Sequence, residues 1–254
     1  MKKILIGAFA AATLISASAA NAAGEAIELP DRSWSFEGIF GSFDRPVLKR
    51  GFQVYTEVCA ACHGLSLVAY RNLADIGMTG PEIEEYASEF EVEDGPDEDG
   101  ELYFRPARPA DKMVPPFPNE QAARAANNSA YPVDLSLIVK ARKNGADYLY
   151  ALMTGYEDEA PEGVELGDGM YYNAYFPGHQ IAMPPPLMED LIEYEDGTPA
   201  TVEQMSEDLT VFLAWTASPE LEERKRLGLK VMLFLLVLTG MLFALKRQIW
   251  AKLH

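Results

Sequence analysis

The sequence has few of the side chains that proteins use to bind metal ions or to exchange disulfides. Its 254 residues include only two cysteines, Cys59 and Cys62, and three histidines. A structural zinc site needs about four protein ligands, and beyond His63 only His179 and His254 could supply the rest. A redox dithiol is expected beside a βαβ pattern, which the flanking sequence does not resemble. The sequence therefore disfavours zinc binding and thiol–disulfide exchange.

Basic residues are also scarce. The chain carries 21 lysines and arginines against 39 aspartates and glutamates, a formal charge of −18 at pH 7. This charge argues against binding nucleic acid through its phosphates and favours partners that present a basic face. Residues 82–101 hold eleven acidic residues and no basic one. We expect this segment to be a solvated, mobile surface excursion, with a docking patch as the alternative reading.

Long apolar runs occur only near the two ends of the chain. Residues 1–22 combine two lysines, an apolar stretch and an Ala-Asn-Ala cleavage signal, which is typical of a bacterial secretory signal peptide. Residues 227–245 are almost wholly apolar, and a run of about 19 residues can cross a bilayer core as one helix. We therefore expect a single-pass protein of the bacterial inner membrane. Its periplasmic domain would span 23–219, its membrane anchor 220–250 and its cytoplasmic tail 251–254.

Residues 59–63 read Cys-Ala-Ala-Cys-His, the spacing typical of covalent c-type haem attachment. Each cysteine sulfur can form a thioether to one vinyl group of the porphyrin, while His63 reaches the iron from the proximal side. Upstream, Leu48, Phe52, Tyr55 and Cys59 lie on one face of a predicted amphipathic helix that ends at the motif. Together with the export signal, the motif predicts one covalent haem c.

A second axial ligand is expected from the aromatic and proline-rich stretch 171–186. Three successive prolines at 184–186 prevent a helix and present Met183 from a stiff, extended loop. A thioether held in this way suits the distal side of a haem iron. On spacing alone, His179 and Met113 remain alternatives to Met183.

The helical patterns predict a mainly α fold: a c-type cytochrome haem domain with long irregular loops, plus one C-terminal transmembrane helix. Asn119 is expected to cap a helix through residue 126, and Asp134 to cap another that stops at Gly145. The last helix before the anchor is expected to start at Thr198 and to be interrupted at Pro219. Residues 25–43 predict an irregular arm packed on the domain.

Several stretches in order along the chain resemble the cytochrome c1 family, the haem-bearing subunits of cytochrome bc1 complexes. They are RGFQVY at 50–55, VCAACH at 58–63, ARAANN at 123–128, residues 173–186, DGTPAT at 196–201 and RKRLGLK at 224–230. These stretches span nearly the whole chain after the signal peptide. The resemblance is therefore far more specific than the pentapeptide alone.

The resemblance implies roles for individual residues. Cys59 and Cys62 would hold the haem, His63 would be the proximal iron ligand and Met183 the distal one. Arg124 matches the family position that contacts a haem propionate, a contact that suits the paired donors of a guanidinium. Some bacterial members carry an extra cysteine pair that bridges a loop, and because this sequence lacks it, packing alone would hold that loop.

The resemblance also implies a function. The chain would accept one electron from the Rieske iron-sulfur protein and pass it to a soluble c-type cytochrome, beside cytochrome b in a dimeric membrane complex. By itself it would not be an enzyme. One alternative is a free-standing membrane-anchored cytochrome that feeds a terminal oxidase. The other is a haem-free exported protein whose cysteine pair binds metal or exchanges thiols.

Overall fold

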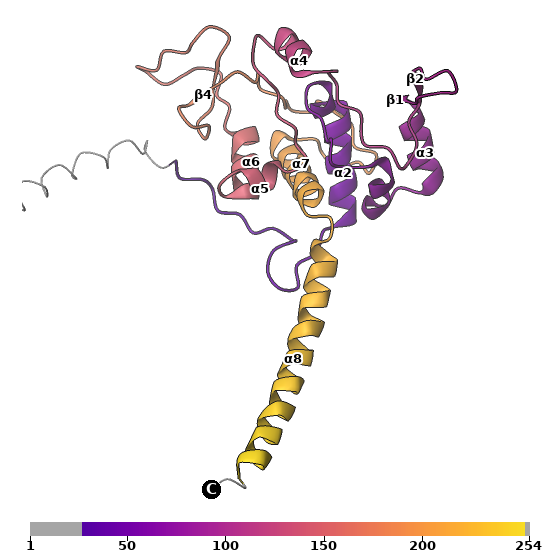
Figure 1. Cartoon of the computed structure of the whole chain (residues 1–254). Coiled ribbons are helices and arrows are strands. Elements are labelled where there is room, and N and C mark those ends of the chain that lie inside the picture. Colours follow the sequence, from indigo (N-terminus) through magenta and orange to yellow (C-terminus); the bar gives the residue numbers. More distant parts are fainter. Residues whose placement is uncertain (1–26, 252–254) are drawn as a thin grey trace, which may run out of the picture.

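Helices make up most of the regular structure (Figure 1). The computed structural model describes residues 27–251, so the predicted signal peptide and residues 252–254 lie outside the described part. The elements in chain order are α2 (Arg45–Glu57), η1 (Cys59–Ala61), η2 (Tyr70–Ile76), α3 (Gly80–Ser88), β1 (Glu91–Asp94), β2 (Tyr103–Pro106), α4 (Glu120–Ala126), α5 (Ile138–Ala141), α6 (Gly145–Thr154), β3 (Tyr171–Tyr172), β4 (Gln180–Ile181), α7 (Val202–Ala217) and α8 (Leu221–Trp250). Long loops connect them. The predicted mainly α fold with irregular loops is confirmed.

Helices α2 and α7 pack directly against each other at the centre of the body, which we define as residues 27–217 (Figure 1). The rings of Phe52 on α2 and Phe212 on α7 lie 5.7 Å apart. Gly51 permits this approach, because a Cβ at that position would lie 2.1 Å from the backbone oxygen of Asp208 and 2.6 Å from Cβ of Phe212. The close contact fixes α2, and with it the cysteine motif at the end of α2.

A buried ion pair locks the same two helices. Asp208 on α7 is fully buried. Arg50 on α2 donates from Nε and Nη2 to its two carboxylate oxygens at 2.9 and 3.0 Å. Arg50 Nη1 donates to Asp196 at 2.9 Å, and Gln204 Nε2 donates to Asp208 at 3.1 Å. A buried carboxylate is tolerated only when it is paired and hydrogen-bonded in this way. The pair therefore favours a single register of α2 against α7.

The segment before α2 is extended and irregular, as predicted. Trp34, Phe36 and Phe43 are buried in the core of the body. The indole Nε1 of Trp34 donates to Asp147 on α6 at 2.8 Å. These contacts hold residues 27–43 against the rest of the body.

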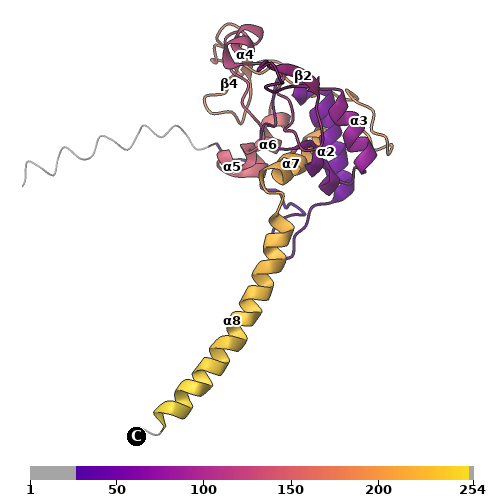
Figure 2. The same ribbon diagram turned by 45° about the vertical axis from the view of Figure 1, so that its right-hand side comes forward.

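Helix α8 extends away from the body in both views (Figure 1 and Figure 2). It has 30 residues, none of them buried, and its most apolar stretch has a mean hydropathy of 2.3. At a rise of about 1.5 Å per residue, its apolar stretch matches the ~30 Å core of a bilayer. In the part of the chain that the structure describes, α8 alone is long and apolar enough to cross a membrane. The prediction of one such C-terminal helix is confirmed.

The acidic segment 82–101 has more regular structure than its composition suggested, although residues 95–101 form an exposed loop. Its first part is helix α3, which buries Ile83 and Ala87. Its second part contributes β1 to an antiparallel hairpin with β2. Arg105 on β2 pairs with Asp94, and it also donates to Asp111 at 2.6 and 3.1 Å. The composition was misleading because the few apolar residues of the segment all face the core, while the carboxylates stay on the surface.

Two other helix boundaries differ from the prediction. Helix α7 starts at Val202 rather than near Thr198, and the hydroxyl of Thr201 accepts from the backbone N–H of Gln204 at 3.1 Å to cap it. The helix expected from Asp134 to Gly145 shrinks to α5, a single turn. The carboxylate of Asp134 is used elsewhere, at the candidate site.

Candidate functional site

The cysteine motif forms one tight turn directly after α2. Helix α2 ends at Glu57, and the 3-10 turn η1 follows over Cys59–Ala61. The backbone N–H groups of Cys62 and His63 both donate to the carbonyl of Cys59, at 3.1 and 2.9 Å. The turn therefore brings the two thiols and the imidazole together on one short stretch of backbone.

The ring of His63 is held in one tautomer. Its Nδ1 lies 2.7 Å from the backbone carbonyl of Val133. Because a carbonyl oxygen can only accept, Nδ1 carries the proton and Nε2 carries the free lone pair. Burial lowers the pKa of His63, which keeps the ring neutral. A neutral histidine whose other ring nitrogen donates to a carbonyl is the arrangement that metal-ligating histidines adopt.

A segment about seventy residues downstream binds His63 and the turn that follows it. We call residues 133–136 the clamp segment. Besides the bond from His63, it makes three hydrogen bonds to the turn after the motif: Leu135 N–H to Gly64 O at 2.9 Å, Ser66 N–H to Asp134 Oδ2 at 2.8 Å and Leu67 N–H to Ser136 Oγ at 3.1 Å. Burial works to raise the pKa of Asp134, but hydrogen bonds from Ser136 and Ser66 outweigh it and lower the pKa. Asp134 is therefore an ionised acceptor that orders the turn.

The Cys59 thiol is unsuited to redox chemistry. Burial raises the pKa of Cys59 to about 12, and the nearby Cys62 adds to the effect. Reactive and redox-active cysteines have a lowered pKa instead, because the thiolate is the nucleophile. Within residues 27–251, no three His, Cys, Asp or Glu side chains gather as a metal site of that kind would require. The geometry suits cysteines that tether a group through carbon–sulfur bonds.

A small hollow of about 140 Å³ lies beside the motif. Its lining is mostly aromatic or aliphatic and consists of Tyr55, Ala60, Tyr70, Tyr86, Phe90, Met113, Val114, Pro115 and Pro116. Met113 is buried, and its backbone N–H donates to Val68 at 2.9 Å. The hollow is too small to hold a porphyrin by itself. It supplies an apolar wall next to the pentapeptide.

Met183 lies partly buried against the same hydrophobic core as Cys59 and Ala60. Its backbone carbonyl accepts a hydrogen bond from the hydroxyl of Tyr156 at 3.1 Å. Burial raises the pKa of Tyr156, so the hydroxyl keeps its proton at neutral pH. The loop of Met183 is thus tied to the end of α6 rather than free to move.

A buried asparagine orders the chain before Met183. Asn173 is fully buried and donates from Nδ2 to the carbonyl of Leu152 at 2.8 Å. Its Oδ1 accepts from the backbone N–H groups of Tyr175 and Phe176 at 3.0 and 3.1 Å. His179, the rival ligand, stacks its ring on Tyr172 at a centroid distance of 5.8 Å. The His179 ring is therefore already packed, whereas the sulfur of Met183 makes no hydrogen bond with any other residue of 27–251.

Arg124 lies on α4, whose predicted cap is confirmed, since Asn119 Oδ1 accepts from the backbone N–H of Ala122 at 2.9 Å. The guanidinium donates to Glu120 at 2.8 Å and to the carbonyl of Ser129 at 2.9 Å. Its side chain remains 47% exposed. In Figure 1, α4 lies beyond the end of α2 that carries the motif. Arg124 is thus an exposed cation on the motif's side of the body.

The structure brings some of the predicted site residues together and not others. Cys59, Cys62 and His63 share one turn. Among residues 27–251, no hydrogen bond or ion pair joins Met183 or Arg124 to that turn. Sequence reasoning missed the clamp segment, Tyr156 and the role of Asn173. Asp134 was noticed only as a helix cap, and the partners that reveal its role lie far away in sequence.

Comparison with known proteins identifies the relatives of this chain. Residues 34–253 match the Cytochrome C1 family. Cytochrome c1 of Rhodospirillum rubrum is 48% identical over 98% of this chain and 97% of the relative. A protein of Saccharomyces cerevisiae named "Cytochrome c1, heme protein, mitochondrial" is 51% identical over 93% of this chain and 77% of its own length. A Bradyrhizobium diazoefficiens protein named "Cytochrome b/c1" is 49% identical over 89% of this chain, which covers only 36% of that longer relative.

The family match covers most of the chain, and the Rhodospirillum relative is similar over most of both sequences. Both findings agree with the cysteine motif, the neutral His63 and the apolar C-terminal helix. The chain belongs to the cytochrome c1 family.

Proposed function

We propose that this chain is the haem-bearing electron-transfer subunit of a cytochrome bc1 complex, with one covalent haem c. It accepts one electron from the Rieske iron-sulfur protein and passes it to a soluble c-type cytochrome. The observation that carries the proposal is the hydrogen bond of 2.7 Å between His63 Nδ1 and the carbonyl of Val133. It leaves Nε2 unprotonated and able to bind iron.

The residues present fit a covalent haem. Cys59 and Cys62 would supply the thioether bonds, His63 the proximal nitrogen and Met183 the distal sulfur. When bound, the haem supplies one-electron chemistry at its iron. The clamp segment fixes the orientation of the His63 ring, and the apolar wall beside Ala60 excludes water. The neutral thioether of Met183 favours ferrous iron relative to a second imidazole and so raises the reduction potential.

Tyr156 would position Met183 by holding its backbone carbonyl. For Arg124 we propose a contact with a haem propionate. The exposed guanidinium would then exchange part of its pairing with Glu120 for a carboxylate of the ring.

The proposed partners follow from charge, from the anchor and from the relatives. A chain with a charge of −18 attracts a soluble cytochrome with a basic face at a distance and still releases it quickly. Helix α8 would anchor the chain beside cytochrome b, in keeping with a relative named "Cytochrome b/c1". We place residues 23–219 in the periplasm after removal of 1–22, the C-terminus in the cytoplasm, and the chain in a dimeric complex of the bacterial inner membrane.

Three measurements on the intact membrane preparation test the proposal. Haem staining after denaturing electrophoresis should remain at the mass of this chain, because only a covalently held ring survives. Added quinol should reduce that haem, and cytochrome b should co-purify. A stained chain that ignores quinol and purifies without cytochrome b would instead be a free-standing cytochrome.

A substitution tests the distal ligand. Met183→Leu should keep the covalent haem but lower its midpoint potential sharply, because the iron loses its thioether. His179→Gln is the matched control and should leave the potential near that of the wild type. If Met183→Leu kept the wild-type potential and spectrum, Met183 would not be the ligand.

A further inference from the structure

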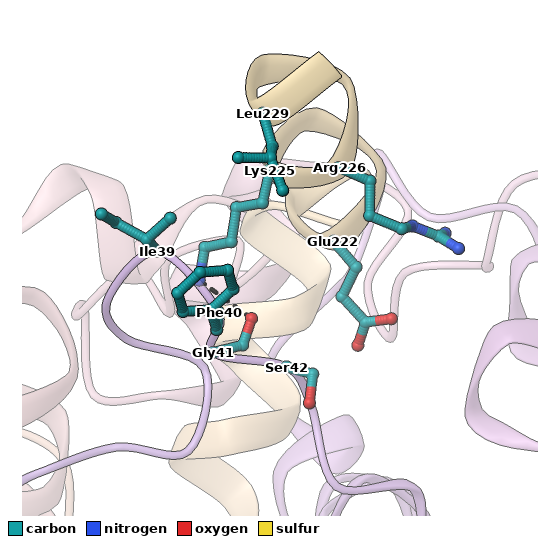
Figure 3. Close-up of a pocket in the computed structure, with 8 residues that line it drawn as sticks. All are labelled: Ile39, Phe40, Gly41, Ser42, Glu222, Lys225, Arg226 and Leu229. Carbon is teal, nitrogen blue, oxygen red and sulfur yellow. Dashed lines mark hydrogen bonds between the residues drawn. The ribbon is translucent and has the colours of Figure 1, made fainter. Parts of the chain in front are cut away.

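The junction between the N-terminal arm and α8 contains a surface pocket of about 250 Å³ that the electron-transfer site does not use. Its lining comes from two segments more than 170 residues apart in sequence: Ile39, Phe40, Gly41 and Ser42 from the arm, and Glu222, Lys225, Arg226 and Leu229 from α8 (Figure 3). The side that holds Ile39, Phe40 and Leu229 is apolar. Lys225 reaches into the arm loop beside Phe40, and Glu222 and Arg226 lie on the other side (Figure 3).

Within residues 27–43, the exposed large apolar side chains are Ile39 and Phe40, and both line this pocket. Phe36 and Phe43, at the two ends of the loop, are 9% and 5% exposed. Between them Ile39 and Phe40 are 72% and 83% exposed. In water this exposure is unfavourable, because burying an apolar side chain of this size stabilises a protein by roughly 1.5–3 kcal/mol. A pair of exposed apolar side chains on a fixed loop marks a surface that meets an apolar medium or a partner.

The loop is held rigidly in this exposed position. Lys225 Nζ donates to the carbonyls of Phe36 and Gly41 at 2.6 and 3.0 Å. The backbone N–H of Phe43 donates to Glu222 Oε1 at 2.9 Å. A Cβ on Gly41 would lie 1.8 Å from the carbonyl oxygen of Glu37, so the loop closes on itself too tightly for any other residue. The first turns of α8 therefore fix where Phe40 lies.

The pocket sits at the level where the apolar stretch of α8 begins. Arg226 directly precedes the apolar run 227–245, and Leu229 lies inside it. Because the arm loop is hydrogen-bonded to Glu222 and Lys225, just before this run, and shares the pocket with Leu229, Ile39 and Phe40 would lie at the boundary between headgroups and hydrocarbon. A phenyl ring and an aliphatic side chain at that depth contact acyl chains, as interfacial apolar residues do.

The charges at the pocket leave one cation available. Glu222 is paired with Arg45 at 3.0 Å, and Lys225 is directed into the loop carbonyls. Arg226 is exposed and makes no side-chain hydrogen bond or ion pair with any other residue of 27–251. Figure 3 shows its guanidinium extending away from the helix, on the side opposite Phe40. A free guanidinium at headgroup level is complementary to a phosphate, in a chain whose overall charge is strongly negative.

We propose that this pocket binds an anionic phospholipid of the leaflet next to the body, with its phosphate on Arg226 and its acyl chains against Ile39, Phe40 and Leu229. This inference rests on the proposed membrane anchoring by α8. The arm loop then forms a second, shallow membrane contact. The lipid fills the angle between the loop and α8.

The first experiment asks what touches the arm loop. A photo-reactive phenylalanine analogue is placed at position 40 in the full haem-loaded chain and irradiated in its native membrane. The control is position 104, because Phe104 on β2 is 67% exposed but belongs to the hairpin, far from α8 in both views. The expected result is an adduct of phospholipid mass at position 40 and none at 104. Cross-linking of position 40 to another polypeptide, or to nothing, would overturn the proposal.

The second experiment tests the phosphate contact with a matched pair of substitutions. Arg226→Gln removes the lining cation, whereas Arg224→Gln removes an equal charge two residues away that does not line the pocket. Each full-length protein is placed in lipid nanodiscs of mixed phosphatidylglycerol and phosphatidylcholine, and the retained lipid is identified by mass spectrometry. Arg226→Gln should lower the preference for phosphatidylglycerol about fivefold, the effect of one basic side chain at a membrane surface. Equal preferences in the two variants would refute the site.

The remaining outcomes separate a lipid site from a simple anion site and from the electron-transfer function. Displacement of phosphatidylglycerol by millimolar inorganic phosphate would show that any anion suffices and would overturn the lipid assignment. Haem staining and quinol-dependent reduction should be equal in both variants. If the wild-type protein showed neither haem staining nor reduction by quinol, the proposed function would be refuted. The result on lipid binding would be unaffected.

Discussion

The contact between α2 and α7 gives the most direct test of how the motif is positioned. The change is Gly51→Ala. In the middle of an exposed helix this substitution stabilises the helix by about 1 kcal/mol, because glycine loses more backbone entropy on folding. Here the new methyl group would lie 2.1 Å from the backbone oxygen of Asp208. The clash involves backbone, so no side-chain rotation relieves it.

The magnitude follows from the displacement that the clash requires. Atoms in ordinary contact sit about 3.5 Å or more apart, and the new Cβ would lie 2.1 Å from the oxygen, so α2 and α7 must separate by roughly 1.4 Å. A gap of that size costs the facing side chains about half or more of their dispersion energy. Overpacking of a core typically costs about 1–3 kcal/mol and occasionally more. We expect a net loss of about 3 kcal/mol, which in a domain of this size lowers the Tm by roughly 6–12 °C.

The assay is thermal unfolding of the purified chain in detergent, followed by near-ultraviolet circular dichroism, with the covalent haem content measured in parallel. Gly228→Ala is the matched control, because Gly228 is also in the interior of a helix but has no atom within 4 Å of the position its Cβ would take. The control should keep the wild-type Tm or raise it slightly. A Gly51→Ala protein with unchanged or higher Tm would show that the close approach of α2 and α7 is not as described.

Three further predictions concern partner, pH and ligand position. Electron transfer to a basic soluble cytochrome should slow as ionic strength rises past about 0.1 M, because the Debye length falls below ~10 Å there. A rate that does not change with salt would show that the acidic surface plays no part in docking. Hydrogen bonds from Arg105 lower the pKa of Asp111 to about 2. Because the folded pKa lies below the unfolded value of about 3.9, the stabilisation is present above pH 4 and is lost as the pH falls toward 2. Melting curves between pH 5 and pH 2 should therefore drop less steeply for Asp111→Asn, and parallel curves would contradict the ion pair. Tyr156→Phe should keep the haem but let added cyanide displace the distal ligand several-fold more easily, because one hydrogen bond contributes about 1 kcal/mol. Tyr171→Phe is the control. If it behaved like Tyr156→Phe, the contact between Tyr156 and Met183 would be contradicted.

Local sequence patterns predicted those parts of the fold that depend on local physics. The spacing of Leu48, Phe52 and Tyr55 gave the position of α2 and placed the motif at its end, because an amphipathic helix needs only its own residues to define its buried face. Asn119 was recognised as a cap for the same reason, since its acceptor serves an N–H three residues away. Export and haem attachment were predicted from short motifs that act without the fold.

The predictions that were wrong or missing concern contacts between residues far apart in the sequence. Asp134 resembles a helix cap in sequence, yet its carboxylate accepts from Ser66, 68 residues earlier. The helix expected to start at Thr198 begins at Val202 instead, and the side chain of Thr201 caps it. The acidic segment looked unstructured because its composition is dominated by carboxylates. The two residues that anchor α3, Ile83 and Ala87, contribute little to that composition. No pattern in the sequence could assign Tyr156 to Met183.

The short connection between α7 and α8 limits how the protein can move. Only three residues separate Ala217 from Leu221, and Arg45 and Phe43 of the body both bind Glu222 on the first turn of α8. If the chain carries the proposed haem and α8 anchors it in the membrane, this connection would keep the haem at a constant distance from the bilayer. Any movement that electron transfer requires would then have to come from the partner proteins.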